Sequence, residues 1–242
     1  MRNIKLTLEY DGTAYAGWQA QANALAIQDV VRRAVEQMTE EKVKLLGASR
    51  TDAGVHALGQ VASFQTSREI PCGGFLKGLN SLLPEDIRVK SCEEVALDFH
   101  PIRDAKQKTY RYLFDTENIP SALERNRAWW VGPGLDWQAM ETASRCLAGE
   151  HDFKSFVAAG GEVKTTVRRL EEVGFAKDQI TFTGNGFLKQ MVRNIVGTLV
   201  AIGRDNKCQA PTVMQDILGA KDRTQAGPTA PPQGLYLVGV EY

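Results

Sequence analysis

The sequence predicts an α+β fold, in which a mixed and mainly antiparallel sheet is flanked by helices. The predicted strands alternate apolar and polar residues, which is typical of antiparallel sheets with one solvated face. Two of them, 170–176 and 179–187, follow each other closely enough to form a hairpin. Strands and helices alternate irregularly, and the pattern starts again near residue 103. We therefore expect two α+β parts, residues 1–102 and residues 103–242.

The first part opens with a strand over residues 4–10, in which every second residue is apolar. Residues 27–38 then repeat apolar side chains at helical spacing and predict an amphipathic helix. The remaining predicted elements of this part are strands at 42–46 and 60–64, a helix at 74–83 that Pro84 ends, and a strand at 87–92. Between the strands at 42–46 and 60–64 lies a stretch of small residues that carries an arginine and an aspartate.

The second part continues this pattern. Its predicted elements are an aromatic-rich strand at 108–114, a helix at 135–149, the hairpin, a long amphipathic helix at 187–203 and a closing strand at 235–242. Asp136 is placed to cap the first of these helices, because its side chain can accept from free backbone amides, and Gly149 is placed to end it. Residues 226–234 are rich in Gly and Pro and predict a loop.

The composition is that of a globular protein, with 242 residues of which 43% are hydrophobic and 24% charged. No apolar run approaches the ~20 residues of a membrane span. Residues 1–12 alternate like a strand and lack the apolar centre of a signal peptide, so we expect a cytoplasmic protein. The three histidines and the four separated cysteines show no metal-ligand spacing, so we expect neither a metal nor a disulfide framework. The cysteines are Cys72, Cys92, Cys146 and Cys208.

The net charge is zero, with 29 basic and 29 acidic residues, which by itself argues mildly against a nucleic-acid partner. The charges are segregated along the chain, however. Basic residues gather at 103–111 and 186–204, and acidic residues dominate at 85–98. Such segregation would suit a basic cleft on a neutral protein, and it would equally suit solvated faces of mixed charge. The charge pattern alone leaves both alternatives open.

The stretch "GASRTDAGVHALGQ", residues 47–60, sets Arg50 and Asp52 among small and apolar residues. Asp and Gly are ordinary turn residues, so a turn is the simplest interpretation of these residues alone. The small neighbours, however, would let a backbone or a ligand approach closely. An arginine beside the aspartate would favour its charged form, which a carboxylate nucleophile requires.

This stretch resembles the active-site motif of the TruA family of tRNA pseudouridine synthases, and further motifs match that family in order along the chain. They are "LEYDGTAYAGWQAQANALAIQDVV", "KTYRYLF", "GEHDFKSF", "GFLKQMVRNIVGTLVAIG" and the closing "GLYLVGVEY". The resemblance therefore covers nearly the whole chain. Two departures stand out: Ser49 replaces the usual glycine before the arginine, and Ala26-Ile27-Gln28 replaces the usual Thr-Val-Gln.

The resemblance implies an enzyme that isomerises uridine to pseudouridine in the anticodon stem-loop of tRNA. It further implies no cofactor, two related halves around a central cleft, and a homodimer. Asp52, in the first part, matches the catalytic aspartate of the family. Its carboxylate could add to the base, attack the anomeric carbon of the sugar, or stabilise a cationic or glycal-like sugar, and these routes stay open.

Four further residues take roles from the same resemblance. Arg50 is expected to keep Asp52 ionised and to fill the gap left by a flipped nucleotide. Tyr110, on the aromatic strand, matches the tyrosine that stacks on the base and can take the proton from carbon 5. Arg193 is the basic residue expected beside Asp52. Lys189 is expected one helical turn before Arg193, on the same helix face, where it would contact a phosphate.

His56 is expected to be a hydrogen-bonded scaffold residue of the substrate-binding loop, because Asp52 and Tyr110 already supply the chemistry. Other basic residues of the second part are candidates for phosphate contacts, which position RNA without reading its sequence. These candidates are Lys106, Lys108, Arg111, Arg168 and Arg169.

Two rival functions follow from the same residues. A non-catalytic RNA-binding module would have no use for a buried carboxylate near phosphates, so the combination of Asp52 and Tyr110 argues against it. A metal-dependent hydrolase or nuclease would need clustered acids or histidines, which the sequence lacks.

Overall fold

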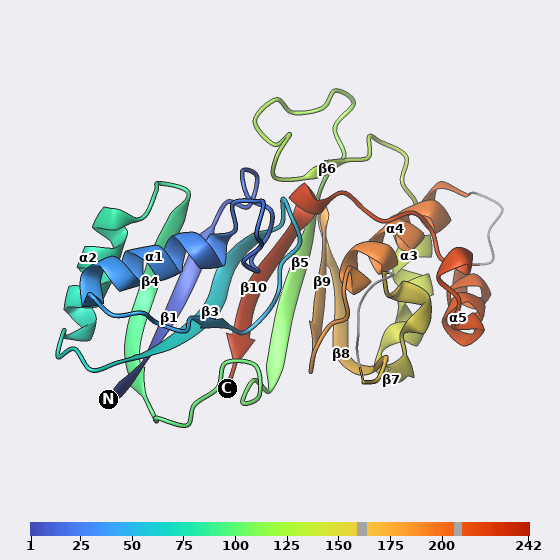
Figure 1. The fold of residues 1–242 in the computed structure, drawn as a ribbon. Coiled ribbons are helices and arrows are strands. Elements are labelled where there is room, and N and C mark those ends of the chain that lie inside the picture. The colour runs from blue at the N-terminus through green and yellow to red at the C-terminus, as the bar shows by residue number, and fades with distance from the viewer. Residues whose placement is uncertain (159–163, 206–209) are drawn as a thin grey trace. The chain divides into compact units, whose positions relative to one another are not determined.

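The computed structural model of the chain describes residues 1–158, 164–205 and 210–242. The chain forms two compact units. Unit 1 consists of Met1–Lys106 together with Tyr236–Tyr242, and unit 2 consists of Gln107–Leu235. The strand that closes the sequence thus belongs with the first unit (Figure 1). Both units combine a sheet with helices, as the predicted α+β class requires.

The sheet of unit 1 has the strand order β4-β1-β3-β10. Its strands are β1 (Arg2–Tyr10), β3 (His56–Thr66), β4 (Ile87–Val95) and β10 (Leu235–Glu241), and the short β2 (Leu46–Gly47) also pairs with β3. β1 runs antiparallel to both of its neighbours, whereas β10 runs parallel to β3, with Tyr236 opposite His56. The sheet is therefore mixed and mainly antiparallel, as predicted.

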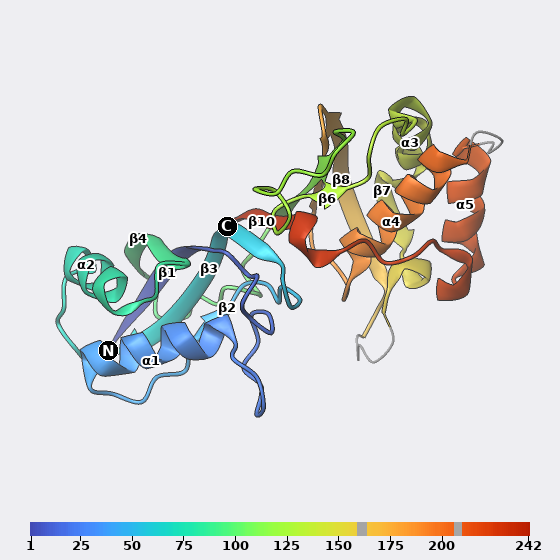
Figure 2. The same cartoon turned by 90° about the horizontal axis from the view of Figure 1, so that it is seen from above.

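Two helices accompany this sheet, α1 (Ile27–Thr39) and α2 (Cys72–Leu82). Helix α1 buries the apolar stripe that the sequence predicted, including Ile27, Val31 and Val35. It packs against α2, which in turn packs against β4 (Figure 2). The core of unit 1 lies between this helical layer and the apolar face of β1, where Ile4, Leu6 and Leu8 are fully buried.

The sheet of unit 2 has the order β5-β9-β8-β7, and all of these neighbours are antiparallel. Its strands are β5 (Gln107–Asp115), β7 (Gly149–Asp152), β8 (Val167–Ala176) and β9 (Gln179–Gly184), and β6 (Trp129–Trp130) adds a short parallel pair to β5. The predicted hairpin is confirmed: Ala176 pairs with Gln179 across a tight turn in which Asp178 has a φ of 56°.

Three helices pack together on this second sheet: α3 (Trp137–Ser144), α4 (Met191–Arg204) and α5 (Ala210–Ala220). The predicted cap of α3 is confirmed, because the Asp136 carboxylate accepts from the backbone N–H of Ala139 at 2.9 Å. Helix α5 was not predicted. Single 3-10 turns occur at Arg145–Leu147, Lys154–Phe156, Arg223–Gln225 and Pro232–Gly234.

Several predicted elements differ in extent from the structure. The helix predicted at 135–149 ends at Ser144 and is followed by a 3-10 turn, and Gly149 opens β7 instead of ending the helix. The long helix was predicted to begin at 187, but α4 begins at Met191, because Gln190 adopts a left-handed backbone conformation with φ of 59°. Lys189 therefore lies outside the helix and does not share a helix face with Arg193. The strand predicted at 42–46 is reduced to Leu46–Gly47.

The backbone hydrogen-bonding groups of residues 43–45, just before β2, bond to side chains of α1 rather than to a neighbouring strand. Val43 donates its N–H to the carboxylate of Glu36, and Gln28 donates its side-chain amide to the carbonyl of Leu45. The apolar side chains of Val43 and Leu45 are still buried. The alternation of apolar and polar residues at 42–46 thus predicts correctly which side chains are buried, although most of this segment pairs with no strand.

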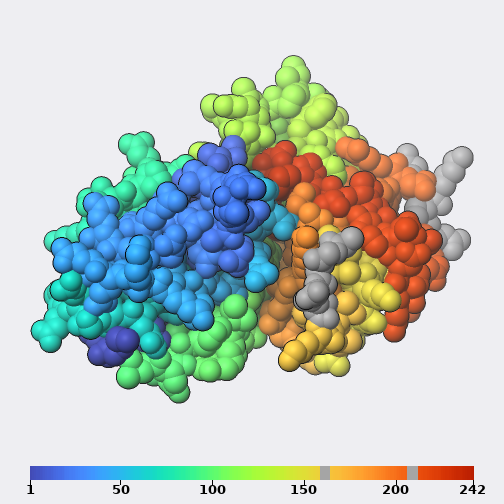
Figure 3. Space-filling model, in the orientation of Figure 1, coloured from blue at the N-terminus to red at the C-terminus, as the bar shows by residue number. Residues whose placement is uncertain are grey.

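The surface of unit 2 carries a long segment between β5 and β6, residues 116–128, coloured yellow-green in Figure 3. Ile119 and Leu123 in this segment are largely exposed. Among the described residues, no helix has the length and apolar character needed to cross a bilayer. Cys72, Cys92 and Cys146 are free thiols, and Cys208 lies outside the described residues.

Candidate active site

Asp52 lies in unit 1, on the loop that joins β2 to β3. The loop backbone is held at several points around it. Trp18 donates its N–H to the carbonyl of Thr51 at 3.0 Å, and Val55 donates to the carbonyl of Asp52 at 3.1 Å. The buried hydroxyl of Thr51 bonds to the hydroxyl of Tyr10 at 2.8 Å. The aspartate thus sits in a turn, as its neighbours suggested, and this turn is fixed on both sides.

The N-terminal segment 11–18 packs directly against this loop, backbone to backbone. Gly17 has a φ of +93°, and a Cβ atom built there would lie 2.5 Å from the carbonyl oxygen of Thr51. A Cβ atom on Gly12 would lie 2.0 Å from the carbonyl oxygen of Val55. Only glycine allows either approach. The contact explains why the "YDGTAYAGW" and "RTDAGVH" motifs both occur in one chain.

His56 is part of this same framework, as predicted for a scaffold residue. Its side chain is buried, and its ring stacks on Tyr236 of β10 with 4.7 Å between centroids. The Nδ1 atom lies 3.1 Å from the N–H of Gly12 and 3.2 Å from a carboxylate oxygen of Asp11. One ring nitrogen cannot accept from Gly12 and donate to Asp11 at once, so Nδ1 accepts from Gly12 when it carries no proton and donates to Asp11 when it carries one.

Gln60, on β3, is a site residue that the sequence analysis missed. Its side-chain amide donates to the carbonyl of Ser49 at 2.7 Å and accepts from the N–H of Ser49 at 3.2 Å. Gln60 itself is fully buried, and its two hydrogen bonds fix the start of the loop at Ser49. Ser49 is also absent from the residues with positive φ, so serine can stand where the family generally has glycine.

The structure shows no ion pair between Arg50 and Asp52. Asp52 is half-buried, whereas Arg50 is exposed, and within the described part of the chain the guanidinium of Arg50 makes no hydrogen bond or ion pair. Residues 52–55 form a turn, with Gly54 at φ of 76°, rather than continuing an extended strand. The role expected of Arg50 therefore stays a prediction.

Tyr110 lies in unit 2, near the middle of β5, with only 5% of its surface exposed. The edge of its ring packs against Phe187 at 4.9 Å between centroids. Lys108 precedes it by two residues and shares its face of the strand, whereas Arg111 points to the opposite face. Tyr112 and Phe114 are buried core residues, and the hydroxyl of Tyr112 donates to the carbonyl of Pro231 at 2.7 Å.

Arg193 and Lys189, also in unit 2, differ in their surroundings. Arg193 is half-buried in the first turn of α4, where its Nε donates to the carbonyl of Ala230 at 2.8 Å and its own carbonyl accepts from the N–H of Ala230. Lys189 is exposed and lies before the helix, and its carbonyl accepts from the N–H of Ala158. Arg193 is thus tied to the loop at Ala230 through both its side chain and its backbone.

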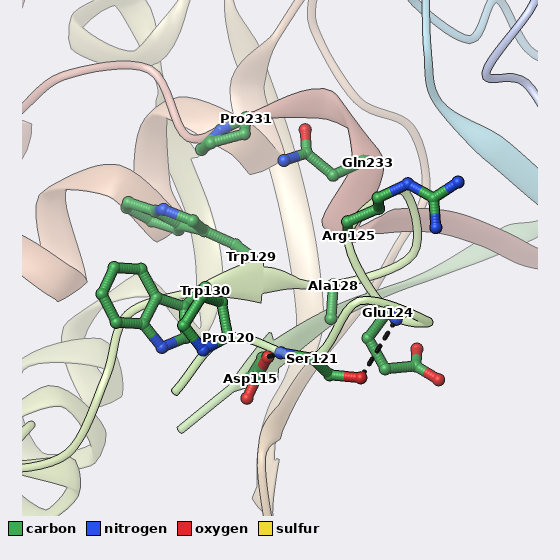
Figure 4. Close-up of a pocket in the computed structure, with 10 residues that line it drawn as sticks. All are labelled: Asp115, Pro120, Ser121, Glu124, Arg125, Ala128, Trp129, Trp130, Pro231 and Gln233. Carbon is green, nitrogen blue, oxygen red and sulfur yellow. Dashed lines mark hydrogen bonds between the residues drawn. The ribbon is translucent and has the colours of Figure 1, made fainter. Parts of the chain in front are cut away.

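A pocket of about 320 Å³ lies in another region of unit 2, where residues of the segment 116–128 form part of its lining (Figure 4). Asp115 organises one wall, because its carboxylate accepts from the N–H groups of Glu117 and Ser121. Trp129, Trp130 and Pro231 contribute apolar surface. None of the residues predicted for the site lines this pocket.

Comparison with known proteins decides among the functions that this loop could serve. A family model described as tRNA pseudouridine synthase matches residues 7–102 and 143–242. The chain belongs to the tRNA pseudouridine synthase family. Enzymes of this family isomerise uridine to pseudouridine in tRNA. The matched segments contain Asp52 and Arg193, whereas Tyr110 lies between them.

Individual relatives match over the full length of the chain. It is 48% identical to tRNA pseudouridine synthase A of Acetivibrio thermocellus, with 100% of both chains covered. It is 47% identical to the proteins of the same name from Geotalea uraniireducens and Ruminiclostridium cellulolyticum, again with 100% of both chains covered. The similarity thus includes the strand that carries Tyr110.

Proposed function

We propose that this protein isomerises uridine to pseudouridine in the anticodon stem-loop of tRNA and that Asp52 is its catalytic carboxylate. The observation that supports this most strongly is the loop around Asp52. In a chain of this family, a half-buried carboxylate stands on a backbone held by Trp18, Val55 and Gln60. Such a loop keeps a charged group in place without help from the substrate, which is what a catalytic group needs.

The reaction breaks the bond between the sugar and N1 of uracil, turns the base, and joins the sugar to carbon 5. The proton of carbon 5 then leaves, and N1 ends protonated. Asp52 can take part by adding to the base, by attacking the sugar, or by stabilising a cationic or glycal-like sugar. All three routes need the carboxylate in its charged form, so they share one test.

We assign the other residues according to the family motifs that they match. Tyr110 stacks on the uracil ring and takes the proton from carbon 5. Arg193 provides positive charge for Asp52, and Arg50 fills the gap in the stem that the flipped uridine leaves. Four further residues serve substrate binding, three by contacting phosphates and His56 by supporting the loop. The three phosphate contacts are Lys189, Lys108 and Arg111.

The proposed partner is tRNA, and no cofactor takes part. We further propose that the enzyme acts as a homodimer in the cytoplasm. The dimer rests on the resemblance to the family, and it can be checked by the mass of the protein in solution.

The proposal is tested by incubating the protein with unmodified tRNA transcripts. Isomerisation leaves the mass unchanged, so pseudouridine must be tagged by a specific derivatisation and then located by mass spectrometry of fragments. We expect tagged uridines in the anticodon stem-loop only. Tagging in another arm of the tRNA would overturn the proposed specificity, and no tagging in any transcript would overturn the proposed activity. EDTA should leave the reaction unchanged, which separates it from a metal-dependent hydrolase.

A further inference from the structure

Two cations of unit 2, Lys108 and Arg168, are brought to the same face of its sheet. Lys108 on β5 pairs with Gly184 of β9, and Gly184 also pairs with Leu170 of β8. Directly paired residues share a face, and so do residues two apart on one strand. Arg168 lies two residues before Leu170, so its side chain projects on the side where Lys108 projects. The glycine between them contributes no side chain.

The two charges affect each other while partly withdrawn from water. Burial, together with the positive charge of Arg168 as a second cause, lowers the pKa of Lys108 to about 8. Burial also lowers the pKa of Arg168. Two positive charges on one face of a sheet attract an anion more strongly than either charge alone.

The Arg168 side chain is held in position by two backbone carbonyls close to it in the sequence. Its Nη1 atom donates to the carbonyls of Thr165 at 2.9 Å and Val167 at 2.6 Å. A Cβ atom on Gly186 would lie 3.7 Å from the Nε atom of Arg168, so the absence of a side chain leaves room beside the guanidinium. The backbone thus uses part of the guanidinium and leaves further N–H donors for a ligand.

We propose that Lys108 and Arg168 together bind a single phosphate group of the RNA strand, next to the uridine that reacts. The inference rests on the proposed function and adds to it a shared phosphate site. Lys108 and Tyr110 lie two residues apart on one face of β5, about 7 Å along the strand. A nucleotide whose base meets Tyr110 therefore brings its own phosphate, or that of its neighbour, within reach of the pair.

The test measures the affinity of the full-length protein for tRNA between about 50 and 200 mM salt. Lys108→Gln and Arg168→Gln should each weaken binding about tenfold and lower the salt slope by about one phosphate contact, or roughly 0.7 to 0.9 on logarithmic axes. The double variant should lower the salt slope by no more than either single variant does. If both residues bind the same phosphate, that contact is already lost in each single variant. Lys177→Gln, which neutralises an exposed lysine at the β8–β9 turn, is the matched control and should match the wild type.

Three outcomes would overturn the shared site. The double variant could lose two phosphate contacts, which would place the residues on separate phosphates. The single variants could bind like the Lys177→Gln control. Lys108→Gln could unfold at a lower temperature than the wild type without RNA, which would indicate a packing role, since removing a buried charge should leave stability equal or higher. The failure of wild-type protein to modify any tRNA would instead contradict the proposed function.

Discussion

Gly17 lies against the backbone of Thr51 and Asp52, so closely that a Cβ atom there would come 2.5 Å from the carbonyl oxygen of Thr51 and 2.9 Å from the carbonyl carbon of Asp52. A backbone atom, unlike the end of a flexible side chain, cannot move aside without moving the aspartate. Segment 11–18 therefore supports the Asp52 loop, and the close contact at Gly17 fixes the backbone that carries the carboxylate.

Gly17→Ala should displace the Asp52 loop and lower the free energy of unfolding by more than about 2 kcal/mol, because it adds both a clash and a left-handed backbone strain. Turnover should fall further than stability alone explains. Urea unfolding and single-turnover assays of the same samples measure the two effects. Gly73→Ala is the control, because a Cβ atom there meets nothing within 4 Å. Equal activity of Gly17→Ala and Gly73→Ala would refute this account of the loop.

Gln60→Leu should lower the free energy of unfolding by about 1–3 kcal/mol, because the N–H and carbonyl of Ser49 lose their partners in a buried position. Turnover should also drop, with little change in tRNA affinity, since the change loosens the loop and not the phosphate contacts. Gln65→Leu, on the same strand but exposed, should stay within about 0.5 kcal/mol of the wild type. A Gln60→Leu variant with normal turnover would show that the clamp on Ser49 is dispensable.

Asp52→Asn should reduce isomerisation by ~10³ or more while leaving tRNA binding largely intact, because the amide keeps the size of the side chain and loses its charge. Derivatised tRNA fragments report the activity, and a filter-binding or fluorescence titration reports the affinity. Asp98→Asn, an exposed carboxylate of the same unit, should behave as the wild type. Retention of even a tenth of wild-type turnover would exclude Asp52 as the catalytic residue.

Tyr110→Phe should bind tRNA normally and form product much more slowly, because the ring remains and the hydroxyl is lost. Tyr110→Leu should lose both affinity and activity. Since the ring is almost fully buried, circular dichroism must first show that both variants fold. Full activity of the Phe variant would leave Tyr110 with a packing role alone.

The lowered pKa of Lys108, about 8, predicts how stability depends on pH. In the unfolded chain this lysine has a higher, ordinary pKa, so between these values the unfolded state binds more protons than the folded state. The linkage relation then makes the contribution of Lys108 to stability rise with pH above about 8, by at most about 1.4 kcal/mol per unit. Lys108→Gln should remove this rise. Urea unfolding of both proteins at pH 8, 9 and 10 measures the difference, and parallel curves would contradict the prediction.

Much of the fold could be predicted because the apolar pattern is strong where one face of an element is buried. The strand at 4–10, the helix at 27–38 and the hairpin after residue 170 all follow this rule. The start of α4 could not be predicted, because Phe187 and Leu188 continue the helical spacing while the backbone at Gln190 turns left-handed. Apolar spacing reports which side chains are buried and not where the backbone dihedrals change.

The candidate site was predicted only in part, for a related reason. Asp52 could be named from its motif, but its supports are contacts between residues far apart in the sequence. Gln60 reaches Ser49 because β3 folds back beside the loop, and Gly17 reaches Thr51 because segment 11–18 packs there. Such contacts depend on the register of whole strands, and no local pattern encodes them.

The position of β10 bears on how the protein matures during synthesis. The strand runs parallel to β3, and its Tyr236 stacks on His56, the residue that ends the Asp52 loop. The ribosome makes β1, β3 and the loop early, and it makes the whole of unit 2 before residues 236–242 emerge. Until then, the start of β3 at His56 and Ala57 lacks its parallel partner strand. The aspartate loop acquires its last support only when those residues arrive, so translation itself delays the completion of the site.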